Sequence, residues 1–158
     1  MRQTLMLTIL ALLFWGCSGG GEKSPSPSRS EQELLSSYLA LHQKKDLPGT
    51  IDLFYRQDTP TYVIDSVKER VQKNFALTIA SAKIEEIPPE KLGKVMAGFP
   101  FNGKTLVPNL KPLKQISLIF TTAGPPAEKR TAGGSIMFGK VDNICYFVLS
   151  KEKEAGAK

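Results

Sequence analysis

The chain has 158 residues, one domain's worth of length, and a formal net charge of +6. Its single histidine and two cysteines are too few for the four Cys or His ligands of a conventional structural zinc site. No GxSxG, P-loop or GxGxxG pattern occurs, so neither composition nor motifs indicate a metal or an organic cofactor.

Residues 1–16 have the layout of an export signal. Arg2 gives a positive start, and an apolar run extends from Thr4 to Trp15. At about 1.5 Å per residue this run is too short for a bilayer core of about 30 Å, but it suits the apolar region of a signal peptide. A buried core helix is the weaker interpretation, because a Ser-Gly-Gly-Gly stretch follows at once.

The stretch from Leu13 to Cys17 resembles the lipobox of bacterial lipoproteins, in which a small residue precedes an invariant cysteine. The resemblance implies cleavage after Gly16 and acylation of Cys17, which would anchor the chain in a membrane through at least two lipid chains. Ser18 stands where inner-membrane retention usually has aspartate, which favours the periplasmic face of the outer membrane. With Cys17, residues 18–30 are predicted to form a flexible Gly, Ser and Pro tether.

Helical patterns follow the tether. Ser30 and Glu33 have the spacing of a capping box, ahead of apolar residues at helical intervals. Asp46 predicts the cap of a short second helix, and a third, clearly amphipathic helix follows Pro60. The second half carries strand patterns, at residues 77–87, 115–122, 135–141 and 144–150. The tail from residue 151 to 158 is predicted to be frayed.

The last two predicted strands are joined by Asp142-Asn143, which suits a two-residue hairpin turn. This turn predicts a register in which Tyr146 lies opposite Gly139 and its ring covers the glycine. Both faces of the hairpin are then apolar, so something must cover each. The helices can cover one face. The other face, which includes Met137 and Tyr146, needs the 88–114 segment, a second subunit or a ligand.

Residues 88–114 contain five prolines and three glycines, with no predicted structure beyond a short helix near residues 90–97 and an exposed turn at 98–103. Five lysines stand there against one glutamate. A solvated loop is one interpretation. The other is a contact surface for an anionic partner, such as lipid headgroups, lipopolysaccharide or an acidic protein. Nucleic acid is not expected as a partner. The candidate contact residues are Lys91, Lys94, Phe99, Phe101, Lys104, Met137 and Tyr146.

The order of elements predicts an α+β fold, with N-terminal helices packed on a curved antiparallel sheet of about four strands, as one domain over residues 31–150. Two stretches, 37–46 (SYLALHQKKD) and 141–148 (VDNICYFV), resemble the first-helix end and the terminal strand of the cystatin-like roll of the nuclear transport factor superfamily. The resemblance implies a cone-shaped cavity and frequent dimers through the sheet, but no single activity.

Three functions remain open on the sequence. The main hypothesis is a non-enzymatic, membrane-tethered domain of the cell envelope that binds a ligand or a protein. The second is a cavity enzyme in which His42 pairs with Asp46 or Asp52 as a base. The third is a structural subunit that dimerises through its sheet. Cys145 is expected to be a buried small hydrophobe, although pairing between two chains is the alternative.

Overall fold

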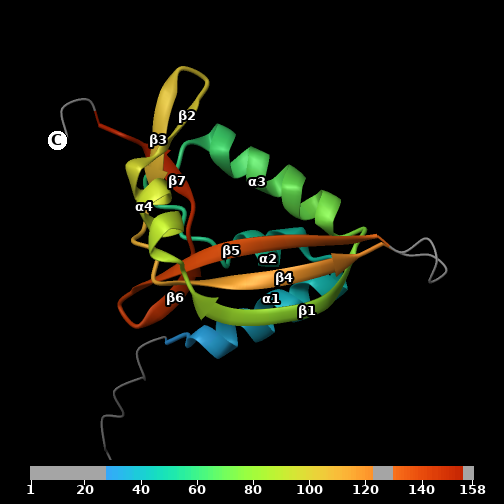
Figure 1. Cartoon of the computed structure of the whole chain (residues 1–158). Helices are drawn as coiled ribbons and strands as arrows, with labels where there is room; N and C mark the ends of the chain where they lie inside the picture. Colours follow the sequence, from blue (N-terminus) through green and yellow to red (C-terminus); the bar gives the residue numbers. More distant parts are fainter. Residues whose placement is uncertain (1–27, 123–129, 155–158) are drawn as a thin grey trace, which may run out of the picture.

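The structure is a computed structural model, and it describes residues 28–122 and 130–154. Three helices come first, and an antiparallel sheet of four strands and a smaller sheet of three follow (Figure 1). The predicted α+β class is confirmed. The predicted signal peptide at residues 1–16, the predicted lipidation site Cys17 and nearly all of the predicted tether lie outside the described residues.

The first three helices begin where the sequence predicts: α1 (Glu31–Lys44), α2 (Leu47–Ile51) and α3 (Thr61–Asn74). The capping box of α1 is confirmed. The Glu33 N–H donates to Ser30 Oγ at 3.2 Å, and the Ser30 N–H donates to the Glu33 carboxylate at 2.6 Å. Asp46 caps α2 by accepting from the Gly49 N–H at 2.9 Å. These bonds satisfy N–H groups that a first helical turn leaves unpaired.

The large sheet has the strand order β1-β4-β5-β6, with every pairing antiparallel. Its strands are β1 (Thr78–Glu86), β4 (Lys114–Thr121), β5 (Thr131–Val141) and β6 (Ile144–Phe147). The register predicted for the last hairpin is confirmed in three pairs: Val141–Ile144, Gly139–Tyr146 and Phe138–Phe147. The turn residues Asp142 and Asn143 have positive φ angles of 46° and 68°, as this turn requires.

Two strand boundaries differ from the prediction. β5 starts at Thr131 instead of residue 135, so Gly133 and Gly134 lie inside a strand and not in a connection. The predicted strand over 144–150 is broken, because β6 ends at Phe147 and a new strand, β7 (Ser150–Glu152), joins the smaller sheet. The first residues of the predicted frayed tail, Lys151 and Glu152, therefore belong to a strand.

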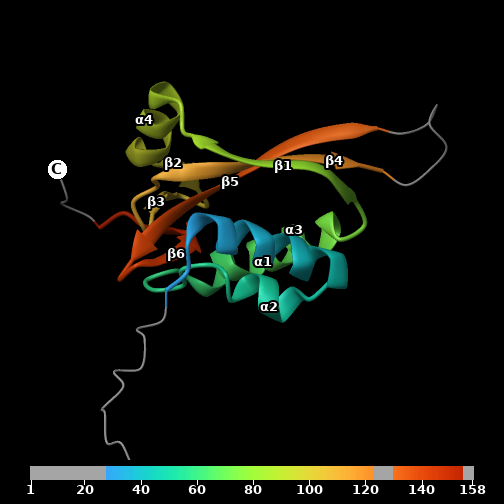
Figure 2. The same cartoon turned by 90° about the horizontal axis from the view of Figure 1, so that it is seen from below.

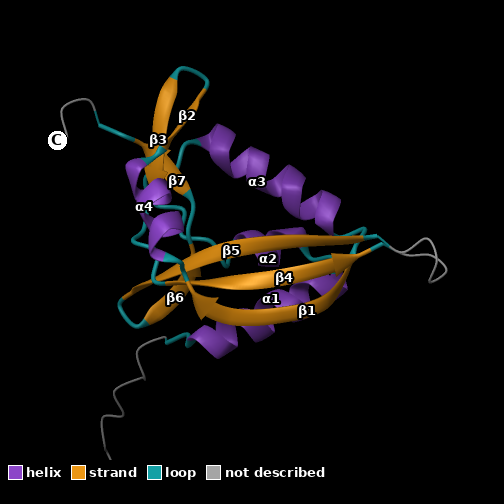
Figure 3. Ribbon diagram, viewed as in Figure 1, coloured by secondary structure: helices purple, strands orange, loops and turns teal. Residues whose placement is uncertain are grey.

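The proline-rich segment 88–114 is more ordered than the sequence predicts. Its short helix is confirmed as α4 (Pro89–Ala97). A hairpin of β2 (Phe99–Phe101) and β3 (Lys104–Pro108) follows and stands apart from the large sheet (Figure 3). β3 also pairs with β7, more than forty residues further along the chain. A local sequence pattern does not reveal a strand whose hydrogen bonds come from so distant a partner.

Asn109 holds the chain where it leaves β6. The Asn109 N–H donates to the Leu149 carbonyl oxygen, and Asn109 Oδ1 accepts from the Leu149 N–H, both at 3.0 Å. Asn109 Nδ2 also donates to the Tyr55 carbonyl oxygen at 2.5 Å and to Thr59 Oγ1 at 2.8 Å. The backbone of Leu149 is thereby bonded to Asn109 on the side away from β5, and the next residue, Ser150, begins β7 and pairs with Pro108 of β3.

The core lies between the large sheet and the helical layer. Helices α1, α2 and α3 lie on one side of the large sheet, and α4 lies on the other (Figure 2). Tyr38 of α1 packs edge-on against Phe147 of β6, with ring centroids 5.4 Å apart. Phe138, Phe147, Leu34 and Ile116 have no exposed surface. Each buried side chain of this size contributes roughly 1.5–3 kcal/mol to stability.

The opposite face of the last hairpin is covered in part by the chain between β3 and β4. A Cβ at Gly139 would collide with the Lys111 carbonyl oxygen and would lie 2.8 Å from the Leu110 side chain. Tyr146 packs instead on Tyr55, with ring centroids 5.7 Å apart. The close approach of the backbone, and not an aromatic cover by Tyr146, therefore explains the glycine.

We expect Gly139→Ala to lower the free energy of unfolding by about 1–3 kcal/mol, because the new methyl group meets backbone that cannot move without disturbing the strand. Gly133→Ala is the matched control, since no described atom lies within 4 Å of its Cβ position. It should change stability by less than about 0.5 kcal/mol. Urea unfolding followed by circular dichroism measures both. Equal stability of the two variants would contradict the packing.

A second prediction concerns pH. Tyr38 is 2% exposed, and burial raises the pKa of its hydroxyl to about 12. A tyrosine in the unfolded chain ionises near pH 10, so the unfolded state loses this proton first and stability falls from about pH 10 to about pH 12. Between about pH 9 and pH 11.5 the wild type should lose about 2 kcal/mol more than Tyr38→Phe. Urea unfolding at both pH values tests this, and equal losses would refute it.

Candidate functional site

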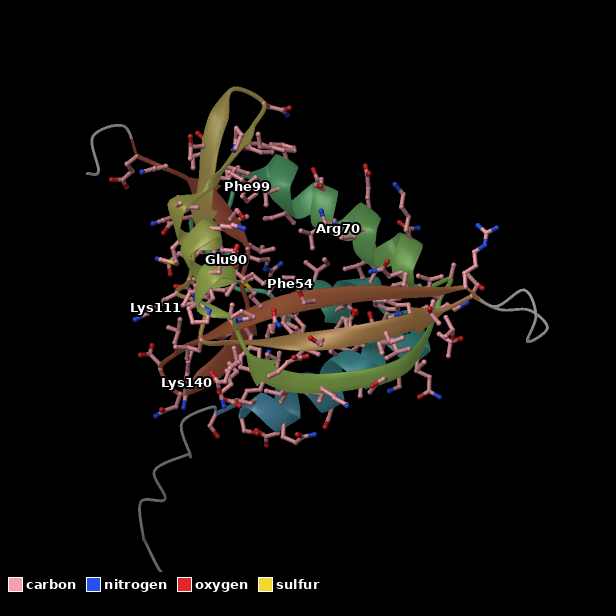
Figure 4. The ribbon with its side chains drawn as sticks, in the orientation of Figure 1. Phe54, Arg70, Glu90, Phe99, Lys111 and Lys140 are labelled. Carbon is pink, nitrogen blue, oxygen red and sulfur yellow. The ribbon has the colours of Figure 1, made fainter. Side chains whose placement is uncertain are left out.

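A groove runs beside β5, with a cavity volume of about 480 Å³. This volume lies within the range of about 300–1,000 Å³ that is usual for ligand sites. Val67 and Val71 of α3 line one wall, and β5 from Gly134 to Met137 lines the other. Phe54, Arg70 and Phe99 come from three different parts of the chain and surround the same opening (Figure 4).

The groove exists because β6 is short. β6 pairs with β5 only from Phe138 to Val141, and no other described strand pairs with that side of β5. The Val148 N–H donates to the Met137 carbonyl oxygen at 2.9 Å, and this bond closes one end. From Thr131 to Ile136, β5 is therefore an open edge of the large sheet among the described residues.

The backbone groups at this edge can be assigned. The Thr122 N–H donates to the Arg130 carbonyl oxygen at 3.1 Å, so Arg130 faces β4. The Met137 carbonyl oxygen accepts from the Val148 N–H, so Met137 faces the side of β5 away from β4. Backbone groups of an antiparallel strand alternate between its two edges. The N–H and C=O groups of Thr131, Gly133 and Ser135 therefore point towards the open edge, as the Met137 carbonyl does.

Two adjacent glycines belong to the open edge, and of the two, Gly134 lines the groove. Gly133 and Gly134, which precede the strand predicted at residues 135–141, lie in the middle of the open edge. No described atom lies within 4 Å of a Cβ built at Gly133, and at Gly134 the nearest is Phe120 Cε2 at 3.4 Å. Neighbouring packing thus does not require either glycine. Glycine inside a strand often marks a place where another backbone or a ligand comes close.

The groove carries one kind of charge. Among its described lining residues, Arg70 is the one charged side chain, and it is exposed. Its helical neighbours at i−4 and i+4 are Ser66 and Asn74, so no carboxylate stands at the spacing of a helical ion pair. The guanidinium forms no ion pair with another described residue. An anionic group would therefore be favoured at this end of the groove.

The predicted contact residues divide between the groove and other places. Phe99 and Met137 line the groove. Lys91 Nζ donates to Gln115 Oε1 at 2.6 Å and to Ser135 Oγ at 2.7 Å, which places this lysine beside the groove. Phe101 lines an adjoining hollow and stacks on Tyr62, with ring centroids 5.8 Å apart.

The other three predicted contact residues lie outside the groove. Lys104 Nζ lies 2.6 Å from Glu152 Oε1, and this hydrogen bond raises the pKa of Lys104 and lowers the pKa of Glu152. Lys94 pairs with Glu90 at 2.6 Å. Tyr146 packs on Tyr55, as described above. The seven residues therefore do not form one continuous surface.

His42 and the two aspartates that could serve it are not brought together. The His42 Nε2 N–H donates to the Asn74 carbonyl oxygen at 3.1 Å, and the buried ring packs on Phe75. Asp46 is the cap of α2, and Asp52 pairs with Arg56 at 3.1 Å. Each of the three side chains thus has a structural partner, and none lines the groove.

Cys145 is 3% exposed and packs in the main core. Burial raises the pKa of its thiol, which disfavours the reactive thiolate. This environment fits the interpretation as a small hydrophobic side chain. In the part of the chain that the structure describes, no three His, Cys, Asp or Glu side chains lie close enough to hold a metal ion.

Sequence reasoning missed both walls of the groove. The amphipathic pattern after Pro60 correctly predicts the helix that carries Val67 and Val71, but it does not predict which surface that helix leaves open. For β5, the strand pattern predicts a start at residue 135, which leaves Gly133 and Gly134 outside the predicted strand. Comparisons of the chain with protein-family models, with curated proteins and with solved structures give no significant match.

Proposed function

We propose that the protein is a lipid-anchored binding domain of the bacterial cell envelope, that it has no catalytic role, and that the groove beside β5 holds its ligand. The anchor rests on the lipobox-like stretch from Leu13 to Cys17. Among the described residues, no helix combines the length and the apolar character needed to cross a membrane.

The observation that carries the binding role is the chemistry of the groove. Its described lining is mainly apolar, with Arg70 as the one charged side chain and no histidine, cysteine or carboxylate. Acid–base catalysis needs a titratable group within hydrogen-bond reach of the substrate. A mainly apolar cleft with few polar groups and an open strand edge is suited to hold a ligand rather than to transform it.

The position of the groove suits a tethered protein. The described chain starts at Ser28, and Arg29 bridges to Ile144 of β6. In Figure 1 the described chain starts next to β6, below β5 in this view, whereas α3 lies above β5. An extended chain reaches at most about 3.5 Å per residue, so residues 17–27 could span about 40 Å. A span of this length would leave the groove room to bind a partner away from the membrane surface.

A structural subunit that dimerises through its sheet remains the second candidate, because an open strand edge is also a surface on which two sheets can join. Light scattering of the full chain in detergent separates the two candidates. A dimer that Gly133→Pro converts to a monomer would favour the structural subunit, since proline removes a backbone donor at the edge.

The anchor is tested by labelling cells of a Gram-negative host with radioactive palmitate. The wild type should carry the label and sediment with membranes, whereas Cys17→Ser should do neither, because no thiol remains to be acylated. Cys145→Ser is the matched control and should behave like the wild type. A Cys17→Ser protein that is still labelled and membrane-bound would contradict the anchor.

The groove is tested separately with an apolar fluorescent dye, anilinonaphthalene sulfonate. Gly134→Leu should lower dye binding at least fivefold, since the new side chain starts at the groove wall and fills the space. Gly133→Ala should bind the dye like the wild type. Equal binding by both variants would show that the dye, and with it the proposed ligand site, is elsewhere.

A further inference from the structure

We propose that the groove takes an extended peptide segment of a partner protein, which adds a strand to the open edge of β5 and carries apolar side chains at alternate positions and a carboxylate near Arg70. This inference rests on the groove being the binding site. It goes further by naming the class of ligand and the hydrogen bonds that recognise it.

The edge supplies the main-chain contacts. Thr131, Gly133 and Ser135 direct their N–H and C=O groups outward, and all three residues are exposed. The stretch from Thr131 to Ile136 is about 20 Å long at about 3.3 Å per residue. A peptide of about six residues in a strand conformation would match it. Strand addition of this kind draws affinity from the backbone and specificity from the side-chain pockets.

The floor of the groove supplies the apolar contacts. A strand added to β5 would lie about 4.8 Å from it, on the side of α3. Every second side chain of such a strand would point into the groove, towards Val67, Val71 and Phe54. An apolar residue at each of these positions would cover surface that α3 leaves open. A compact apolar molecule could fill the same volume, but it would leave the backbone groups of β5 without partners.

The two edges of the large sheet differ in a way that supports this assignment. β1, at the far edge, carries the exposed charges Lys83, Glu85 and Glu86, and its register with β4 slips between Ile79 and Ser81. Charges and bulges are the usual protection of an edge strand against pairing with another chain. The stretch Thr131–Ile136 of β5 has no charge, no proline and no register shift with β4. The sheet therefore protects one edge and leaves the other ready to pair.

The charge at the groove points to an acidic peptide. Arg70 lies in the wall without an ion-pair partner among the described residues, and Arg130 is exposed directly before β5. Both would attract a peptide with an aspartate or glutamate. The chain from Cys17 onward, with 20 basic and 15 acidic residues and a net charge of +5, adds to this attraction over longer distances.

A second copy of the chain fits the edge less well than a peptide does. Antiparallel pairing of two β5 strands would keep the helical layers of both copies on the same side of the joined sheet. Because α3 extends beyond the edge of β5 (Figures 1 and 2), the α3 of one copy would then come beneath the sheet of the other, where α1 already packs. A single added strand brings no helix with it.

The test uses the full chain reconstituted in phosphatidylcholine vesicles and a fluorescein-labelled nine-residue peptide, with alternating valine and threonine and one central glutamate. Co-sedimentation with vesicles measures binding, and empty vesicles are the blank. Gly133→Pro should weaken binding at least tenfold, because it removes an outward N–H that β4 does not use. Gly133→Ala keeps this N–H and should bind like the wild type. Equal binding by the two variants would overturn the proposal.

Two peptide isomers, N-methylated at either the odd or the even amides, test the same contact from the other side. One isomer should bind like the parent, and the other should bind at least tenfold more weakly, because only one set of amides faces β5. Parent-like binding by both isomers would contradict strand addition.

Arg70→Glu keeps the test decisive if Gly133→Pro does not fold, because Arg70 is exposed and its replacement leaves the sheet intact. This variant should prefer a peptide with lysine in place of glutamate, which reverses the wild-type preference. Lys73→Glu is the control, because Lys73 lies on the same helix but outside the groove lining. This control should keep the wild-type preference for the glutamate peptide. An unchanged preference in Arg70→Glu would overturn the assignment of the carboxylate.

The dye experiment separates the two possible failures. If the dye binds in the groove but no peptide does, the strand proposal is wrong and the binding site stands. If neither binds, the proposed function itself is contradicted. If the full chain is a dimer that Gly133→Pro dissociates, the edge belongs to a second copy and the peptide proposal is overturned.

Discussion

The pairing between Asn109 and Leu149 determines the arrangement of the second half of the chain. On the side away from β5, the Leu149 N–H and the Leu149 carbonyl oxygen each bond to Asn109 at 3.0 Å. The following residues are thereby led to β3, where β7 completes the smaller sheet. The same diversion ends the cover that β6 gives to β5. The small sheet and the open edge are thus two results of one change of direction in the chain.

The open edge of β5 can bind more than backbone because α3 lies beside it and lines the same groove. A sheet edge in plain solvent offers only backbone groups, whereas here Val67 and Val71 add apolar surface and Arg70 adds a charge. Gly134 of β5 lines this space and has no side chain that would fill it. Hydrogen-bonding groups, apolar surface and charge are therefore brought together from segments that lie about sixty residues apart in the sequence.

The sequence predicted the parts of the fold that short-range chemistry determines. The capping box at Ser30 and the Asp142-Asn143 turn depend on residues at most three positions apart, and both are confirmed, as is the register that the turn imposes. The missed parts depend on distant partners. The start of β5 receives its hydrogen bonds from β4, and β3 receives its own from β2 and β7. Of the seven predicted contact residues, Phe99 and Met137 line the groove. A sequence pattern can indicate that an apolar side chain is exposed, but it does not show which residues surround it.

Amide hydrogen exchange along β5 tests the central claim most directly. In the full chain, the amides of Ala132, Gly134 and Ile136 should be protected by β4, whereas those of Thr131, Gly133 and Ser135 should exchange rapidly. Addition of the acidic alternating peptide should slow the exchange of the second set and leave the first unchanged. Equal protection of both sets without the peptide would contradict an open edge, and so would a peptide that binds without protecting the second set.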